Sequence, residues 1–327
     1  MTRDGSGLCA VLACLAWGAA PVSVFPQSGA KGPVAPLGAD PHAAMHGMVM
    51  VPRFEGAHLP VEEGWTRLSF QVDRDHGRRD RNNVQMDLEA EFYSLTAAIG
   101  GRLSPDWEAS AEVTGASWDG NLRLQRGNTN LIPDGDISSS PSRVVLRAKT
   151  TLPELDTFQG TLLEDAVFGA VFLLKLPIGG HNDLVDTGSH DVATALQMSR
   201  PLGPFWIHLQ GGVTSVGTGQ AFPTDEPLGD VWSWDAGIGW RDPLRTEWTL
   251  QVEGASSPFR QVASLDRHVA HNRAGFRRDF GTFRVETGAG WGHDTDSGKW
   301  SLYAAVTIPI ASPWPRIGDR GWEEILR

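Results

Sequence analysis

Residues 84–92 read Val-Gln-Met-Asp-Leu-Glu-Ala-Glu-Phe, and this stretch decides the fold class. Its apolar residues occupy alternate positions, and the positions between them carry acids or an amide. A strand sends alternate side chains to opposite faces, whereas a helix would scatter these acids around its circumference. The stretch therefore predicts a β-strand with one apolar face and one acidic face.

The same period of two recurs from residue 64 to residue 310, in about twelve segments of roughly ten residues, the length of a tilted transmembrane strand. The connections between the segments alternate in length. Longer, polar connections are expected at 74–82, 115–141, 177–189, 217–229, 255–268 and 290–299. Short turns are expected at 100–106, 200–204, 241–245 and 279–281, and the stretch at 153–165 is a longer exception. Outer-membrane barrels combine short periplasmic turns with long external loops. We therefore predict an all-β fold, a single antiparallel up-and-down transmembrane β-barrel of about 12 strands.

The alternation does not say which face points inward, because a soluble barrel and a membrane barrel place the apolar face on opposite sides. Aromatic residues at the ends of the segments favour a membrane barrel, in which they form interfacial girdles. At the short-turn end these are Trp65, Trp107, Phe205, Trp240 and Phe276, and at the long-loop end Trp232 and Trp300. The apolar faces also mix Ala, Thr and Gly with large residues, which suits lipid contact. The predicted location is the outer membrane of a Gram-negative bacterium.

The sequence outside the barrel divides into three segments. Residues 1–25 are predicted to be a signal peptide, with a lipoprotein signal acylated at Cys14 as the alternative. Residues 26–63 form a Pro/Gly/Ala-rich segment, expected to be a flexible linker. The barrel is expected to occupy 64–310 and to be followed by a C-terminal extension at 311–327.

Composition limits the function classes. The net charge of −11 gives no basic footprint for nucleic acid. The two cysteines, Cys9 and Cys14, both lie in the predicted signal, so the body has no cysteine for a disulfide framework or a thiolate metal site. We expect no cofactor and no metal. Outer-membrane lipid and lipopolysaccharide are the expected partners, and small solutes could pass through the barrel.

The polar faces of the predicted strands are expected to line the lumen. The candidate lumen residues are Asp87, Glu89, Glu91, Glu108, Glu112, Arg147, Lys149, Lys175, His208, Asp235, Glu247, Glu253, Arg273, Arg284 and Glu286. Opposed acidic and basic walls would create a transverse field that selects solutes, as in a passive pore. The alternative is a narrow barrel in which these charges pair and fill the interior, since buried charges need partners.

Two further features have competing interpretations. Arg74, Arg78, Arg79 and Arg81 fall in the first expected external loop, where they could contact lipopolysaccharide phosphates or form a solvated charge run. The histidines at membrane depth, His208 and His271, have no serine beside them in a nucleophile motif, so no enzyme is expected. A lipid-acting enzyme would need a Ser or Thr within hydrogen-bond reach of one of them on the lipid face.

Several short motifs resemble a known family. They are Asp-Leu-Glu at 87–89, Gly-Arg-Leu at 101–103, Trp-Glu-Ala at 107–109, Lys-Leu-Pro-Ile-Gly at 175–179, Ser-His-Asp-Val-Ala at 189–193, and the stretch from Gly203 to Gly217. Their order resembles domain-of-unknown-function family 3187 of predicted Gram-negative outer-membrane proteins, over roughly residues 65–310. Similar pieces occur in phenol-degradation-type outer-membrane barrel transporters. The resemblance implies an outer-membrane barrel and brings no activity or catalytic residue with it. The family's His-containing segment is not recognisable in residues 115–141, and the chain does not end on an aromatic residue of its last strand.

Overall fold

The computed structural model of the chain describes most of the predicted barrel and little outside it. The described residues are 37, 57, 63–81, 84–126, 129–130, 136–139, 142–152, 163, 165–177, 189–217, 229–242, 244, 246–256, 269–292 and 300–314. The predicted signal peptide and the C-terminal extension after residue 314 lie outside them. No helix among these residues is long and apolar enough to cross a membrane.

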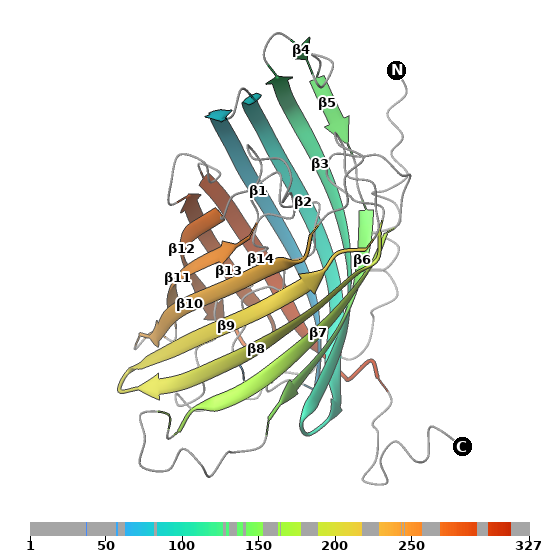
Figure 1. The fold of residues 1–327 in the computed structure, drawn as a ribbon. Helices are drawn as coiled ribbons and strands as arrows, with labels where there is room; N and C mark the ends of the chain where they lie inside the picture. Colours follow the sequence, from blue (N-terminus) through green and yellow to red (C-terminus); the bar gives the residue numbers. More distant parts are fainter. Residues whose placement is uncertain are drawn as a thin grey trace, which may run out of the picture.

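The described residues form one antiparallel sheet. Its strands are β1 (Gly64–Arg81), β2 (Val84–Ser104), β3 (Trp107–Arg126), β4 (Thr129–Asn130), β5 (Asp136–Ser139), β6 (Ser142–Thr151), β7 (Val167–Pro177), β8 (Asp191–Leu202), β9 (Phe205–Ser215), β10 (Val231–Arg241), β11 (Thr246–Ala255), β12 (Val269–Asp279), β13 (Arg284–Gly292) and β14 (Trp300–Ile310). Each long strand pairs with its sequence neighbours, and β3 pairs with β6 past the short β4 and β5. The sheet closes because β1 pairs with both β2 and β14, with Gly64 opposite Ile310. The predicted closed barrel of twelve long antiparallel strands is therefore confirmed (Figure 1).

The connections that follow β2, β8, β10 and β12 are short turns, and these four lie at one end of the barrel. Gly203 and Gly281 occupy two of them in the left-handed backbone region, with φ of 59° and 87°, where a side chain would be strained. The N–H of Gly281 donates to the Asp279 carboxylate at 2.7 Å, which tightens the turn between β12 and β13. Short turns mark the periplasmic end of an outer-membrane barrel.

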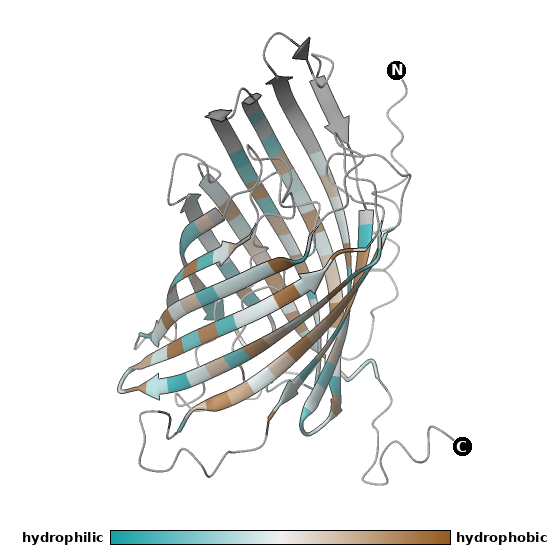
Figure 2. Cartoon of the chain, viewed as in Figure 1, coloured by the Kyte–Doolittle hydropathy of each residue, from teal (hydrophilic) through white to brown (hydrophobic). Residues whose placement is uncertain are grey.

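The wall is apolar outside and polar inside. Along β8 burial alternates residue by residue: Asp191 is fully buried, whereas Leu196 is 67% exposed. Figure 2 shows the same alternation of hydrophilic and hydrophobic residues along the strands. A soluble barrel would bury its large apolar side chains, so this arrangement requires lipid around the wall. The protein is an outer-membrane-type β-barrel.

Aromatic side chains form a band near the periplasmic end. Phe205, Trp240, Trp248 and Phe276 lie on four successive strands, with neighbouring ring centroids 6.4, 6.4 and 5.4 Å apart. Trp107 stacks on Phe172 elsewhere in the wall. These contacts confirm the predicted positions of Trp107, Phe205, Trp240 and Phe276, whereas Trp248 was not predicted.

Trp65 does not belong to this band, and that prediction was wrong. Its indole N–H donates to Glu108 Oε1 at 3.1 Å, inside the barrel. Trp65 has the same parity along β1 as Ser69 and Gln71, which are buried on the inward face. Whether an aromatic residue at a strand end faces lipid or the lumen therefore depends on its position in the alternation of that strand.

The first three strands are longer than predicted. They contain 18, 21 and 20 residues, against 9 to 12 in β6 to β14. About ten residues suffice to cross a bilayer, so these strands continue beyond it and rise above the others in Figure 1. The expected loops at 74–82 and 115–141 were wrong for residues 74–81 and 115–126, which are strand. Polar residues are common both in loops and in strands that stand in water. The polar composition of these residues therefore suggested loops, although the residues are strand.

The four arginines expected in the first external loop are also placed differently. Arg74, Arg78, Arg79 and Arg81 lie within β1, not in a loop. The Arg74 side chain forms ion pairs across to β2, with Glu89 at 3.5 Å and Glu91 at 3.8 Å. The side chains of the other three lie outside the described residues.

Candidate functional site

The interior of the barrel is the candidate site, and most of the predicted lumen residues lie on its wall. Twelve of them have the same parity as the buried inward positions of their strands: Glu108, Glu112, Arg147, Lys149, Lys175, His208, Asp235, Glu247, Glu253, Arg273, Arg284 and Glu286. Arg284 lies at the periplasmic rim and pairs there with Asp279 at 3.6 Å.

Glu89 and Glu91 lie on the outer surface, contrary to the prediction. On β2 the buried positions are even-numbered: Phe92, Ser94 and Thr96 are 3–4% exposed. The two acids have odd numbers, and their side chains are 60% and 42% exposed. Above the membrane, water lies outside the wall, so the acidic face of β2 turns outward. The side chain of Asp87 lies outside the described residues, and its backbone pairs with Arg78.

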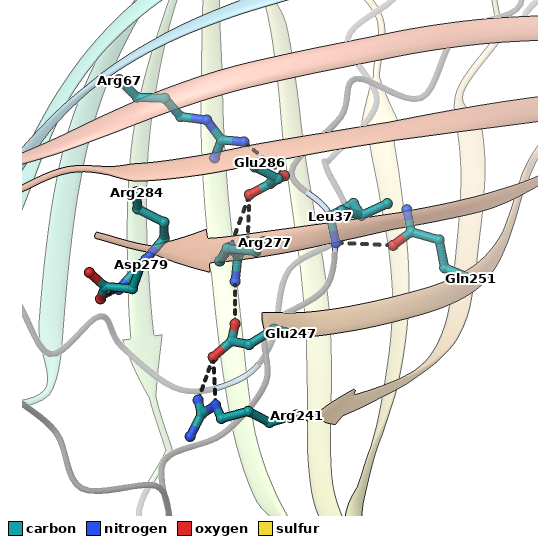
Figure 3. A network of polar contacts seen from close by, with 9 residues as sticks. All are labelled: Leu37, Arg67, Arg241, Glu247, Gln251, Arg277, Asp279, Arg284 and Glu286. Carbon is teal, nitrogen blue, oxygen red and sulfur yellow. Dashed lines mark hydrogen bonds and ion pairs between the residues drawn. The ribbon is translucent and has the colours of Figure 1, made fainter. Parts of the chain in front are cut away.

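A row of alternating charges crosses the periplasmic half of one wall. From β10 to β13 and on to β1 it consists of Arg241, Glu247, Arg277, Glu286 and Arg67 (Figure 3). We call these five residues the charge ladder. Each glutamate bridges two arginines, and each arginine donates to carboxylate oxygen across the strands.

The ladder's geometry follows from strand register. Glu247 lies opposite Arg241 on one side and Arg277 on the other. Arg277 lies opposite Glu286, to which it donates at 2.7 and 3.0 Å. Arg67 reaches Glu286 at 3.2 Å across β14, where the intervening inward residue is the small Ala305. Arg67 also donates to the hydroxyl of Tyr303.

Sequence reasoning missed the three ladder arginines. Arg67 and Arg277 share the parity of polar inward positions, which was the available signal, and Arg241 was assigned to a turn. With three arginines and two glutamates, the ladder carries one excess positive charge.

A second polar row lies nearer the outer end. Gln197, Gln210, Asp235, Glu253 and His271 are successive register partners on β8 to β12. Gln197 donates to Gln210 at 2.8 Å, and Gln210 donates to Asp235 at 3.1 Å. We call these five residues the outer row.

Arg273 is the next inward residue of β12 after His271, and it contacts the outer row. It binds Glu253 at 2.7 and 2.8 Å, and both side chains are nearly inaccessible to solvent. On the facing wall, Arg147 binds Glu108 at 3.5 Å and Ser110 at 3.3 Å. Interior charges of both signs are therefore paired.

Three of the motifs that carry the family resemblance, at 175–179, 189–193 and 203–217, contribute residues to one cluster at the outer end of β7 and β8. Lys175 Nζ lies 3.1 Å from Asp191 Oδ2, and the other carboxylate oxygen accepts from Ser189 Oγ at 3.1 Å. The N–H of Gly217 also donates to this oxygen at 3.4 Å. Residues up to 42 positions apart along the chain, from Lys175 to Gly217, thus form a single polar cluster.

One Ser–His pair lies inside the barrel. Ser199 Oγ and His208 Nδ1 are 2.8 Å apart, and the N–H of Ala57 donates to the same hydroxyl at 2.8 Å. His208 and His271 are both buried on inward positions, 0% and 7% exposed, so neither faces lipid as a lipid-acting enzyme would require. Within the described part of the chain, no three His, Cys, Asp or Glu residues are grouped to hold a metal ion.

Comparison with known proteins identifies the fold. No protein-family model matches the chain, and no curated protein matches it. Among solved structures, an outer-membrane channel from Pseudomonas putida F1 is similar with a TM-score of 0.54 and 11% identity, over 77% of this chain and 96% of that chain. The β domain of the Bordetella autotransporter BrkA aligns over 76% of this chain and 99% of that domain, with a TM-score of 0.45 and 13% identity. At 11% identity the similarity to the Pseudomonas channel shows the fold alone. The outer-membrane barrel implied by the family resemblance is confirmed, whereas membership of family 3187 is not.

Proposed function

We propose that the protein is a passive pore for small hydrophilic solutes in the Gram-negative outer membrane. The observation that carries the proposal is the inner wall of a closed barrel lined with charged and amide side chains in two rows. Such a wall offers hydrogen-bond partners to water and polar solutes, as the interior of porin-type barrels does. Because positive and negative groups alternate along the ladder, we expect weak rather than absolute ion selectivity.

A filled, structural barrel is the second candidate function. It is favoured by the low exposure of the interior charges: Lys175, Asp191, His208 and Glu108 are each at most 2% exposed. Paired charges that exclude solvent would stiffen the wall without conducting. In that case the barrel would act as a scaffold or bind a partner outside the lumen.

Conductance separates the two candidates. Full-length protein reconstituted in a planar bilayer should give discrete channel events with currents of both cations and anions. A liposome-swelling assay should show entry of small neutral sugars and exclusion of larger ones. Folded protein that gives neither current nor swelling would support the structural barrel and overturn the pore.

We also propose lipid and lipopolysaccharide as partners. Arg278 is exposed on the outer face at the periplasmic rim, where its guanidinium lies over the ring of Phe280 at 5.5 Å. Arg74 is 44% exposed on the outer face near the opposite end, beside two carboxylates. In this proposal Arg278 meets phospholipid phosphates of the periplasmic leaflet and Arg74 meets lipopolysaccharide phosphates at the outer end, since arginine binds phosphate well.

A catalytic role is not part of the proposal. The Ser199–His208 pair lies inside the wall, and the hydroxyl already accepts a hydrogen bond from Ala57. An activated serine needs its hydroxyl directed at a substrate carbonyl. We therefore assign this pair to the contact between the wall and the N-terminal region.

A further inference from the structure

Two residues that precede the barrel in sequence lie inside it. Leu37 and Ala57 are 1% and 0% exposed, although the strands begin only at Gly64. The N–H of Leu37 donates to Gln251 Oε1 on β11 at 3.1 Å, as Figure 3 shows beside the ladder. Of residues 26–63, expected to be a linker, the structure describes these two and Glu63, and the other positions lie outside the described residues.

A gap in the wall receives the Leu37 side chain. Gly275 on β12 and Gly288 on β13 are direct register partners. A Cβ atom on Gly275 would lie 2.7 Å from Leu37 Cδ1, and one on Gly288 would lie 3.0 Å from it. A side chain at Gly288 would press on Leu37, and one at Gly275 would also lie 2.4 Å from the carbonyl oxygen of Thr287. We call the pair the glycine notch.

The notch lies between the charged rows. Gly275 is two positions from Arg277 of the ladder and two positions from Arg273, which binds the outer row. Gly288 is two positions from Glu286. These two neighbouring positions lack side chains, although Thr249 and Tyr303 flank them on the adjacent strands, so a leucine can enter an otherwise polar lumen.

Ala57 contacts a different part of the wall. Its N–H donates to Ser199 on β8 at 2.8 Å, and its carbonyl accepts from Thr151 on β6 at 3.3 Å. In the order of paired strands, β6 to β8 lie almost opposite β12 and β13. Leu37 and Ala57 thus contact two facing walls of the lumen.

We propose that the glycine notch is a docking site for Leu37 of the chain's own N-terminal region, and that this docking restricts passage through the lumen. The restriction rests on the proposed pore function, whereas the docking site does not. Leu37 is the occupant because its side chain lies against the two glycines and its backbone N–H donates to Gln251 beside them.

Cross-linking tests the docking site directly. In the full chain, Leu37→Cys is combined with Gly288→Cys, and the matched control combines Leu37→Cys with Ala193→Cys, an inward position on β8. After mild oxidation in membranes, mass spectrometry of peptides should find the 37–288 disulfide and not the 37–193 disulfide. Equal yields, or no 37–288 link in folded protein, would overturn the docking site.

Bilayer recordings test the restriction. Leu37→Ala should raise the mean open-channel current or open probability several-fold, whereas Leu37→Met, which keeps an apolar side chain of similar length, should match wild type. The oxidised 37–288 protein should conduct less than the same protein after reduction. If the cross-link forms but neither comparison shows a difference in current, the restriction is overturned. If it forms and every variant is silent, the pore function fails and the docking site remains.

Discussion

The Lys175 ammonium and the Asp191 carboxylate form an ion pair of 3.1 Å between register partners at the outer ends of β7 and β8. Their side chains are 1% and 0% exposed. Gly217 belongs to the same cluster, since its N–H donates to Asp191. Only glycine fits there, because a Cβ would lie 2.4 Å from the carbonyl oxygen of His190. The pair therefore holds together the points at which β7, β8 and β9 leave the wall.

Breaking this pair should destabilise the barrel strongly. Lys175→Met leaves the Asp191 carboxylate buried without its cation, and loss of one partner of such a pair typically costs about 3–5 kcal/mol. Urea unfolding in lipid vesicles should show a lower midpoint for this variant. A double variant, Lys175→Met with Asp191→Leu, should recover part of the loss. A single variant as stable as wild type would contradict the assignment.

Removal of one of the two carboxylates of the ladder should change ion preference. Glu286→Gln leaves Arg67 and Arg277 with one fewer negative partner, so the lumen gains a net positive charge. The reversal potential in a salt gradient should shift toward anions. Asp279→Asn is the matched control, because it removes one charge at the rim, where the side chain is 38% exposed. Equal shifts for both variants would argue against a conducting path along the ladder.

The aromatic band should contribute to stability in the membrane. Trp248 contacts Trp240 at 6.4 Å and Phe276 at 5.4 Å between centroids. Each aromatic pair is worth about 0.5–1.5 kcal/mol beyond burial, so Trp248→Ala should cost roughly 1–3 kcal/mol from these contacts. Trp232→Ala, at a lipid-facing position that is 62% exposed, should cost less. The comparison is made by equilibrium unfolding in vesicles, and an equal loss would show that lipid contact alone matters.

Acid should weaken the turn between β10 and β11. The N–H of Thr246 donates to the Asp242 carboxylate at 2.9 Å, and this bond, with help from the Trp248 indole, lowers the pKa of Asp242 below 3.8. Because the folded pKa is lowered, the stabilisation is present above pH 3.8 and is lost as the pH falls through the folded value. Asp242→Asn should remove this acid-dependent component of the unfolding midpoint. A variant with the same acid profile as wild type would show that other groups cause it.

The alternation in the sequence was sufficient to predict the closed barrel, its strand positions and most of the inner wall. It failed where the surroundings change along a strand. Residues 84–92 are a strand as predicted, but Phe92 faces inward and Glu91 outward, because that part of β2 stands above the lipid. A period of two shows which residues share a face of the strand, but it does not show whether that face meets lipid, water or the lumen.

The N-terminal contacts could not be predicted from the sequence. Leu37 lies in a Pro/Gly/Ala-rich stretch, and nothing in that stretch distinguishes a free segment from one held in the lumen. Gly275 and Gly288 appeared as small residues in two strands, and only the register brings them together. The ladder was partly visible, since Glu247 and Glu286 were identified, but their arginine partners depend on which strands are neighbours.

Single-channel recording shows whether the interior of this barrel conducts. Wild type and Leu37→Ala are compared in planar bilayers after each is shown to be folded by its heat-dependent shift in electrophoresis. Discrete channel events are predicted for both proteins, larger or more frequent in Leu37→Ala. Complete absence of events from both folded proteins would contradict the account.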